Sequence, residues 1–257
     1  MLNQTFDQLS EMKLNGIKTA LKQQLEQPGT YAGLSFEERL THLIDREAID
    51  RQNRKIIRLQ RLARLKFRQA CIGDIIYKKD RNLHRDQIRS LSHNQWLVEN
   101  QNMIITGATG TGKTWLACAL ADNAIAAGYP VHYIRISQLM SQVLLVRGDG
   151  SYLKWLKKLS RFTLLILDDL GLSSLTTQQA QELLEVIEER SGNGSCIVTS
   201  QLSVKEWYSY FKNPTLADAI MDRLAHNSHR IELEGDSMRE YMARAGVEKS
   251  EDGKKES

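Results

Sequence analysis

The chain has 257 residues, of which 41% are hydrophobic and 26% charged, and a formal net charge of +4. Its length allows one medium-sized domain with an appendage, and no apolar stretch approaches the ~18 residues of a transmembrane helix. The first residues do not have the pattern of a signal peptide, and three scattered cysteines (Cys71, Cys118 and Cys196) fit neither a disulfide framework nor a zinc site, so we expect a cytoplasmic chain with inert thiols.

Residues 1–68 are predicted to form a small all-helical domain. Apolar residues recur at helical spacing over 5–27, and the capping-box sequence Ser35-Phe36-Glu37-Glu38 precedes a second, longer helical pattern. This segment holds 13 Lys and Arg against 8 Asp and Glu, a net charge of +5. The remaining residues hold 22 against 23, a net charge of −1, so the basic excess lies in the N-terminal segment.

The second half of the long helix, residues 51–68, carries eight cations and no acid. Such a helix repels itself unless an anionic partner neutralises it. Duplex nucleic acid rewards this density through counterion release, whereas a membrane surface suits it less because the apolar face is expected to pack within the domain. We therefore expect a DNA-binding helix, with a solvated charged face as the alternative. The expected DNA contacts are Arg51, Arg54, Lys55, Arg58, Arg61 and Arg64.

Residues 69–98 are predicted to be a linker followed by a helix over 85–98, and residues 99–245 an α/β core. Strands are expected at 102–106, 131–136, 163–167, 195–199 and 230–233, with helices near 113–127, 137–146, 177–190 and 216–226. This alternation predicts a parallel, doubly wound five-stranded sheet. The polar tail 246–257 is expected to be disordered.

The loop 107–114 matches the nucleotide-binding pattern G-x-x-x-x-G-K-[ST] at every position, between a predicted strand and a predicted helix. Its glycines let backbone N–H groups approach a polyphosphate, and the following helix N-terminus favours the same anion. We expect Lys113 to reach the β- and γ-phosphates and the Thr114 hydroxyl to bind Mg²⁺. The whole predicted loop is Gly107, Ala108, Thr109, Gly110, Thr111, Gly112, Lys113 and Thr114.

Residues 137–160 contain a short basic amphipathic segment between the second and third strands. Its cations could contact phosphates, and Tyr152 or Trp155 could contact a sugar or base. The alternative is that the aromatic residues belong to the core and the lysines are solvated. The candidate phosphate contacts are Arg147, Lys154, Lys157 and Lys158.

Two adjacent aspartates follow the apolar strand 163–167. A carboxylate at the carboxyl end of a central strand lies where open α/β sheets bind ligands. We expect Asp168 to hold magnesium, directly or through water, and Asp169 to orient or deprotonate the attacking water.

Two further polar residues follow later elements of the core. Gln201 follows Ser200 at the end of the strand 195–199, where a polar residue can sense a γ-phosphate, although it could be an ordinary loop residue. Arg223 lies near the end of a helix, either as a structural cation or as an arginine finger that reaches a neighbouring subunit. Arg239 is a second arginine beyond the last strand, with a structural role as the stronger alternative.

In combination, these features resemble the AAA+ ATPases of the DnaC and IstB type, and the similarity to IstB-like transposition helper proteins runs over nearly the whole chain. The phosphate loop is common to many families, whereas the additional stretches make the resemblance specific. They are Lys13–Ile17, Leu34–Leu40, Leu116–Leu120, Leu167–Gly171, Thr199–Gln201, Pro214–Leu224 and Ser228–Ile231.

The resemblance implies a regulator, encoded by an insertion sequence, that binds ATP, forms an ATP-dependent homo-oligomer on duplex DNA, and stimulates and targets a cognate transposase. It assigns Arg223 to the finger position, Gln201 to the sensor position and residues 137–160 to the inserted element of initiator-type AAA+ proteins. Two departures stand out. Asp169 replaces the glutamate of most AAA+ enzymes, which suggests slow hydrolysis. Little sequence follows Arg239, so we expect the helical lid to be truncated or absent, and a second-sensor role for Arg239 lacks support.

Three other functions fit parts of the same pattern. A DnaC-like replicative helicase loader would have the same core and would differ in residues 1–68 and in its partner. A scaffold with a mainly structural nucleotide is compatible with Asp169. A small-molecule kinase is the least suitable, because it would have no use for the basic helical domain.

Overall fold

The structure is a computed structural model that describes residues 2–238, 240 and 241. Arg239 and the tail 246–257, for which predictions were made, lie outside the described residues. The chain divides into two compact units, Met1–Arg58 and Leu59–Ser257. This division falls ten residues before the expected boundary at residue 68, because the end of the long helix and the segment after it bury Leu59, Ala63 and Leu65 in the second unit.

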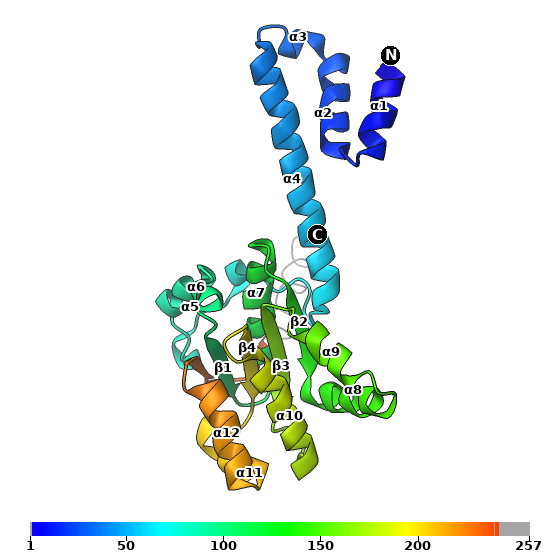
Figure 1. Ribbon diagram of the computed structural model, residues 1–257. Helices are drawn as coiled ribbons and strands as arrows, with labels where there is room; N and C mark the ends of the chain where they lie inside the picture. The colour runs from blue at the N-terminus through cyan, green and yellow to red at the C-terminus, as the bar shows by residue number, and fades with distance from the viewer. Residues whose placement is uncertain (1, 239, 242–257) are drawn as a thin grey trace, which may run out of the picture. The chain divides into compact units, whose positions relative to one another are not determined.

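The first unit is helical, with α1 (Leu2–Glu11), α2 (Asn15–Glu26), α3 (Pro28–Tyr31) and most of α4 (Phe36–Ala63) (Figure 1). The helix expected over 5–27 is divided in two, because Lys13 adopts the left-handed conformation with a φ of 59°. The capping box at the start of α4 is present. The Ser35 hydroxyl accepts the Glu38 N–H at 3.2 Å, and the Glu38 carboxylate accepts the Ser35 N–H at 2.7 Å.

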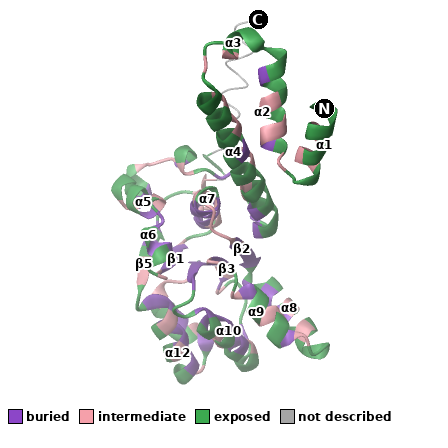
Figure 2. Ribbon diagram, turned by 45° about the horizontal axis from the view of Figure 1, so that its top comes forward, coloured by how far each residue is buried: buried purple, intermediate pink, exposed green. Residues whose placement is uncertain are grey.

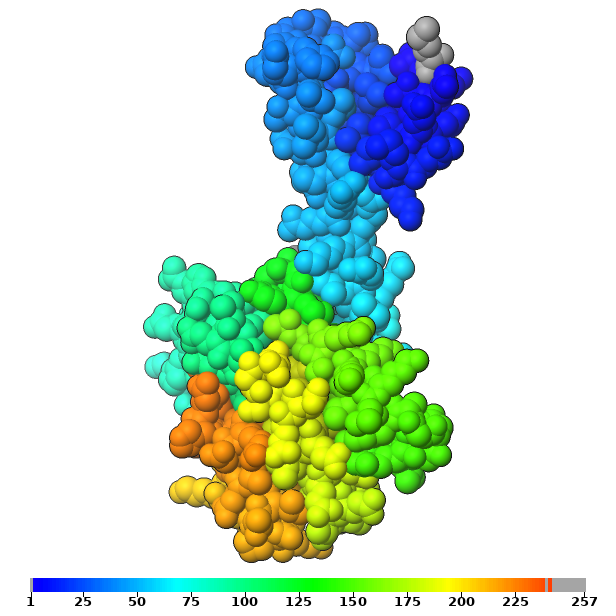
Figure 3. Space-filling view, viewed as in Figure 1, coloured from blue at the N-terminus to red at the C-terminus, as the bar shows by residue number. Residues whose placement is uncertain are grey.

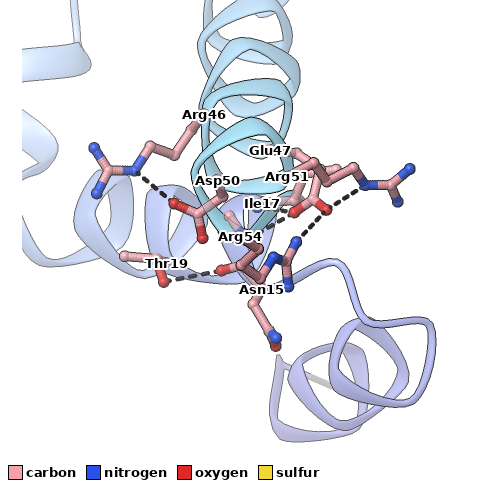
Figure 4. A network of polar contacts seen from close by, with 9 residues as sticks. Asn15, Ile17, Thr19, Arg46, Glu47, Asp50, Arg51 and Arg54 are labelled. Atoms are coloured by element: carbon pink, nitrogen blue, oxygen red, sulfur yellow. Dashed lines mark hydrogen bonds and ion pairs between the residues drawn. The ribbon is translucent and has the colours of Figure 1, made fainter. Parts of the chain in front are cut away.

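Helices α2 and α4 meet at Gly16 and Glu47, and Figure 4 shows Glu47 of α4 beside Ile17 of α2. The buried Glu47 carboxylate accepts N–H groups of Gly16 at 2.7 Å and Ile17 at 3.3 Å, at the start of α2. Burial acts to raise the pKa of Glu47, but hydrogen bonds from Arg51 and from these two amides outweigh it and lower the pKa. A Cβ atom at Gly16 would lie 2.6 Å from the Cα of Glu47, so glycine is what lets the helices approach this closely.

Residues 69–98 are part of the second unit. They form η1 (Ile72–Asp74), η2 (Lys79–Arg81), α5 (Arg85–Ser92) and α6 (Gln95–Val98). The segment expected to be a linker contributes Ala70, Ile75 and Leu83 to the buried core. The single helix expected over 85–98 is interrupted at Asn94, which has a left-handed φ of 59°.

The core is the predicted five-stranded parallel sheet, with strand order β2-β3-β4-β1-β5. Its strands are β1 (Asn102–Gly107), β2 (Val131–Arg135), β3 (Leu164–Leu170), β4 (Ser195–Ser200) and β5 (Ser228–Leu233). The connections contain α7 (Lys113–Ala126), α8 (Ile136–Gly148), α9 (Tyr152–Leu159), α10 (Thr177–Arg190), η3 (Val204–Glu206), α11 (Trp207–Phe211) and α12 (Pro214–Ala225). The carboxyl ends of the neighbouring strands β1, β4 and β3 therefore meet at one edge.

Helices cover both faces of this sheet (Figure 2). Helix α7 contacts β1, β2, β3 and β4 on one face. On the other face, Leu165 and Leu167 of β3 join a buried cluster with residues of α8, α10 and α12. Helices α10 and α12 pack against each other and lie side by side in the space-filling view (Figure 3). Among the described residues, no helix has the length and apolar character to cross a membrane.

Candidate nucleotide-binding site

The loop between β1 and α7 has the backbone that its glycines predict. Gly107, Gly110 and Gly112 have φ angles of 144°, 89° and 96°, a region that L side chains rarely adopt. A Cβ atom at Gly107 would collide with the Leu233 carbonyl, and one at Gly110 with the Ser237 side chain. Gly112 is the N-cap residue of α7, so the free backbone N–H groups of the loop end lie at the helix N-terminus, where an anion is favoured.

Lys113 begins α7 and is 7% exposed. Its ammonium donates hydrogen bonds of 2.8 Å to the carbonyls of both Gly107 and Ala108, so it lies over the loop that precedes it. A buried ammonium held against a concave loop of glycines is suited to phosphate, because the group carries full charge and can exchange its carbonyl partners for phosphate oxygens.

Asp168 lies at the end of β3 and is fully buried. Its Oδ1 atom accepts hydrogen bonds from Thr114 at 2.7 Å and Thr199 at 2.6 Å. Its Oδ2 atom accepts one from Tyr133 at 2.6 Å, and the Lys66 ammonium is 3.9 Å away. Burial and the Asp168 carboxylate both raise the pKa of Tyr133, so this phenol is a donor.

The pairing of Thr114 with Asp168 fits a magnesium ion. A hydroxyl and a carboxylate are hard oxygen ligands, and here the two groups touch directly beside Lys113. The carboxylate also has its remaining oxygen held by Tyr133, which fixes the orientation of the group. Both residues with predicted magnesium roles, Thr114 and Asp168, are thus brought together.

Asp169 has the left-handed backbone conformation, with a φ of 63°, where the pairing of β3 with β4 shifts register between Leu167 and Leu170. Its N–H donates to the Thr199 hydroxyl at 3.0 Å. Asp and Asn tolerate this conformation better than other residues with side chains, because their short polar groups bond locally. The backbone therefore gives a physical reason for aspartate at this position in place of a longer acid.

One cavity of about 1150 Å³ joins most of the predicted site. From the loop it includes Thr109, Gly110, Gly112, Lys113 and Thr114, and from the strand ends it includes Asp169 and Gln201. The lining also includes residues 66–70 together with Asp74, Ile76, Arg81 and Met238. The volume and the mixture of cations, glycines and apolar residues suit a nucleotide.

Arg81 is a residue of this site that sequence reasoning missed. It is buried, and its guanidinium donates to the carbonyls of Thr111, at 2.9 Å, and Ile76. Burial lowers the pKa of Arg81, an effect opposed by the charge of Asp80. The guanidinium packs against the glycine loop: a Cβ atom at Gly112 would lie 3.2 Å from Arg81 Nη2. Its sequence context, a polar run before the first strand, carries no local signal for this role.

Arg223 does not line the cavity that holds Lys113 and Asp169. From α12 its guanidinium forms a 2.7 Å ion pair with Glu188 of α10 and donates to the carbonyl of Ala219 at 3.0 Å. Its side chain remains 30% exposed. Arg223 thus lies outside the nucleotide cavity of its own chain, and its role as an arginine finger stays a prediction.

The cations predicted to bind DNA fall into two groups. Arg51 and Arg54 both pair with Glu47, at 2.7 and 3.2 Å (Figure 4). Arg147 pairs with Glu185 at 2.7 Å and with Glu182 at 3.5 Å, and its guanidinium stacks on Tyr152. Within the described part of the chain, the others are exposed and form no ion pair: Lys55, Arg58, Arg61, Arg64, Lys154, Lys157 and Lys158.

For the second group the DNA-binding role stays a prediction, whereas Arg51, Arg54 and Arg147 pair with carboxylates of this chain. Glu47 lies just outside the acid-free stretch, and the partners of Arg147 are more than 30 residues away along the chain. The aromatic residues Tyr152 and Trp155 stack on each other, with Tyr152 buried and Trp155 packed against the core cluster. This agrees with the alternative that they are core residues.

The glycine loop, the buried Asp168 and the strand order β2-β3-β4-β1-β5 together define a P-loop nucleotide-binding protein with the AAA+ fold. The crystal structure of the DnaC helicase loader is similar, with a TM-score of 0.55 and 22% identity, covering 64% of this chain and 97% of that one. AMPPCP-bound DnaA from Aquifex aeolicus gives a TM-score of 0.56 and 19% identity, covering 70% of this chain and 55% of that one. At these identities the similarity concerns the fold.

The chain belongs to the family of IstB-like ATP binding proteins, whose family model matches residues 7–245. A relative from Sinorhizobium fredii, named as the insertion sequence ATP-binding protein y4pL, is 41% identical over 240 residues, which are 93% of this chain and 97% of that protein. A second, named as an ATP-binding protein of the insertion sequence IS1162 of Pseudomonas fluorescens, is 40% identical over 79% of this chain and 87% of its own length. ATP is accordingly the nucleotide of this family.

Proposed function

We propose that the protein is an ATPase that assembles on duplex DNA in the ATP-bound state and stimulates and targets a partner transposase during insertion-sequence transposition. The observation that carries the proposal is the convergence of Lys113, Thr114, Asp168 and Asp169 at the ends of β1 and β3, in a chain of the IstB-like family. The compartment consistent with this activity is the cytoplasm.

The roles within the site follow from chemistry. Lys113 and the loop amides would hold the phosphates, and Thr114 with Asp168 would hold a magnesium ion, which would supply positive charge against the phosphates. Asp169 orients a water molecule for attack on the γ-phosphate, and Gln201 donates to that phosphate from the end of β4. Asp169 and Gln201 line the same cavity as Lys113, which supports these assignments.

The proposed switch is assembly. ATP bound in the cavity of one subunit and contacted by Arg223 of the next would favour a homo-oligomer, and hydrolysis would release it. The exposure of Arg223 and its absence from the cavity of its own subunit support action in trans. Linkage then requires that assembly raise the affinity for ATP by the same factor as ATP favours assembly.

The proposed ligand outside the nucleotide site is duplex DNA. Exposed cations near the end of α4 and on α9 supply the contacts to DNA phosphates. We expect these contacts to be independent of the DNA sequence. The proposed protein partner is a cognate transposase, because relatives matched over most of this chain are named for insertion sequences.

A helicase-loader function is the second candidate, and the fold similarity to the DnaC helicase loader favours it. The two functions differ in the protein partner. Co-purification with the replicative helicase, in the absence of any interaction with a cognate transposase, would decide for the loader.

The central experiment measures DNA binding and particle size together, on a duplex of tens of base pairs. The four conditions are no nucleotide, ADP, ATP and a nonhydrolysable ATP analogue, with Lys113→Ala as the control. We expect large complexes only with ATP or the analogue, and none with the variant. Small particles that bind DNA equally well in all four conditions would contradict the proposed switch.

A further inference from the structure

The two carboxylate oxygens of Asp168 face different surroundings. Oδ1 accepts from Thr114 and Thr199 on the nucleotide side, whereas Oδ2 is contacted by Tyr133 and lies 3.9 Å from Lys66. Tyr133 and Lys66 also line a second cavity, of about 580 Å³, and Lys66 lines both cavities. The buried acid is thus contacted both by a residue of the nucleotide cavity, Thr114, and by a residue of the neighbouring cavity, Tyr133.

The second cavity is basic. It lies at the end of β2 and the start of α8 and has three cations, Arg64, Lys66 and Arg135, with no Asp or Glu among the residues that line it. Hydroxyl and amide groups of Ser137, Gln138, Ser141 and Gln142 complete the polar wall. Arg64 and Arg135 are exposed and have no ion pair with any carboxylate in the described residues.

His132 also lines this cavity, and its pKa is affected by the cations around it. Burial lowers the pKa of this imidazole, and the nearby charges of Arg64 and Lys158 lower it further, against a raising effect of the Leu62 carbonyl. Lys158 of α9 therefore adds a further cation near the cavity. A set of separate cations matches a polymer of phosphates better than a single small anion.

The geometry points to this cavity as a binding site for a backbone phosphate of duplex DNA, coupled through Lys66 to the magnesium-binding Asp168. The inference rests on the proposed function. It specifies where a DNA phosphate binds and how DNA binding changes the affinity for the metal–nucleotide complex. Arg64 and Arg135 contact the phosphate, and hydroxyl or amide groups of α8 complete its hydrogen bonding.

The coupling follows from competition for one ammonium. At 3.9 Å, Lys66 and Asp168 form a loose ion pair without a direct hydrogen bond. A phosphate in the basic cavity draws the ammonium away and leaves more of the Asp168 charge for a magnesium ion. DNA therefore tightens binding of the metal–nucleotide complex, and by reciprocity the complex tightens binding of DNA.

The first test measures equilibrium binding of a labelled duplex of tens of base pairs to the full chain, over a range of salt concentrations. We expect Arg64→Ala/Arg135→Ala to weaken binding about tenfold or more. The slope of log affinity against log salt should fall by about two, because each missing guanidinium leaves one phosphate charge without its protein cation. The matched control is Arg89→Ala/Lys205→Ala, which removes two exposed cations outside the cavity. Equal behaviour of the two double variants overturns the inference.

The second test measures affinity for a fluorescent ATP analogue with magnesium, with and without saturating duplex, and with the metal chelated. Wild type is expected to bind the metal complex more tightly when DNA is present. Lys66→Met is expected to gain nothing from DNA, whereas Lys66→Arg behaves as wild type, and in wild type the DNA effect is expected to be lost when the metal is chelated. A full DNA effect in Lys66→Met overturns the coupling.

The failure of this inference is distinguishable from failure of the proposed function. If the wild-type protein binds no duplex in any nucleotide state, both the proposed function and the phosphate site in the cavity are wrong. If it binds DNA in an ATP-dependent way and the Arg64→Ala/Arg135→Ala variant binds equally well, only the phosphate site is wrong.

Discussion

The hydroxyl of Thr199 donates a 2.6 Å hydrogen bond to Oδ1 of Asp168 and at the same time accepts the N–H of Asp169 at 3.0 Å. One side chain on β4 thus holds both acids of β3, one through its carboxylate and the other through its backbone. Because Thr199 is buried, it has no water to replace either bond. The carboxylates of the predicted magnesium site and of the water-orienting residue therefore depend on the same hydroxyl.

Thr199→Val tests this dependence. The replacement keeps the shape of the side chain but leaves the Asp169 N–H unpaired, which should lower the free energy of unfolding by about 1–3 kcal/mol. We expect ATP hydrolysis to fall about ten- to a hundredfold and to require more magnesium, because the carboxylate of Asp168 loses a donor that orients it. Thr199→Ser should restore the magnesium dependence in a steady-state ATPase titration. A variant with valine that is destabilised but has normal magnesium dependence would leave Thr199 with a structural role alone.

Asp169→Asn should abolish hydrolysis while preserving binding. Asparagine adopts the left-handed conformation as readily as aspartate, so the backbone at φ 63° is kept and only the charge is lost. We expect turnover to fall by about 10²–10⁴, with the affinity for ATP, measured by fluorescence, within a factor of about two of wild type. Asp169→Glu should destabilise the protein by about 1 kcal/mol, because the longer residue is strained in this region. Faster hydrolysis with no loss of stability in the glutamate variant would contradict this account.

Arg223→Ala and Glu188→Ala remove the two partners of one ion pair and so separate a structural role from a finger role. If Arg223 acts in a neighbouring subunit, Arg223→Ala should reduce hydrolysis in the assembled state by about 10³ or more, whereas Glu188→Ala should have little effect. Mixing Arg223→Ala with Lys113→Ala subunits should recover part of the activity, since each supplies what the other lacks. Equal losses in both single variants would mean that the pair stabilises α10 against α12 and does nothing further.

Gly16→Ala should destabilise the first unit. The new Cβ would meet the backbone of α4 at 2.6 Å from the Cα of Glu47 and 2.8 Å from the Arg46 carbonyl oxygen, neither of which can move as a flexible side chain would. The expected cost is about 1–3 kcal/mol in denaturant unfolding. Gly29→Ala is the control, because nothing lies within 4 Å of its Cβ position in α3, and we expect it to be neutral or slightly stabilising.

Glu47 gives the first unit a pH-dependent stability. Its folded pKa lies below the usual 4.5, so its contribution is fully present above that value and is lost as the pH falls through the folded pKa. Glu47→Gln should therefore be less stable than wild type near neutral pH, and the difference should shrink below roughly pH 4. Unfolding midpoints across this range measure the effect, with Glu37→Gln on the exposed face of the same helix as the control. A constant difference at every pH would show that Glu47 does not act through its charge.

From the sequence by itself, the glycine loop with Lys113 and Thr114, the acids after β3 and the parallel five-stranded core were predictable, because each depends on local backbone preference or on the periodicity of one segment. The helix breaks at Lys13 and Asn94 were not, since neither position holds the glycine or proline that usually marks a helix end, although both residues adopt the left-handed conformation. Strand order and long-range packing alone brought Tyr133, Thr199 and Lys66 around Asp168, placed Arg81 against the glycine loop, and paired Arg147 with carboxylates of α10. Contacts of this kind join residues that are distant in the chain, and their energy depends on distances and burial that no local pattern encodes.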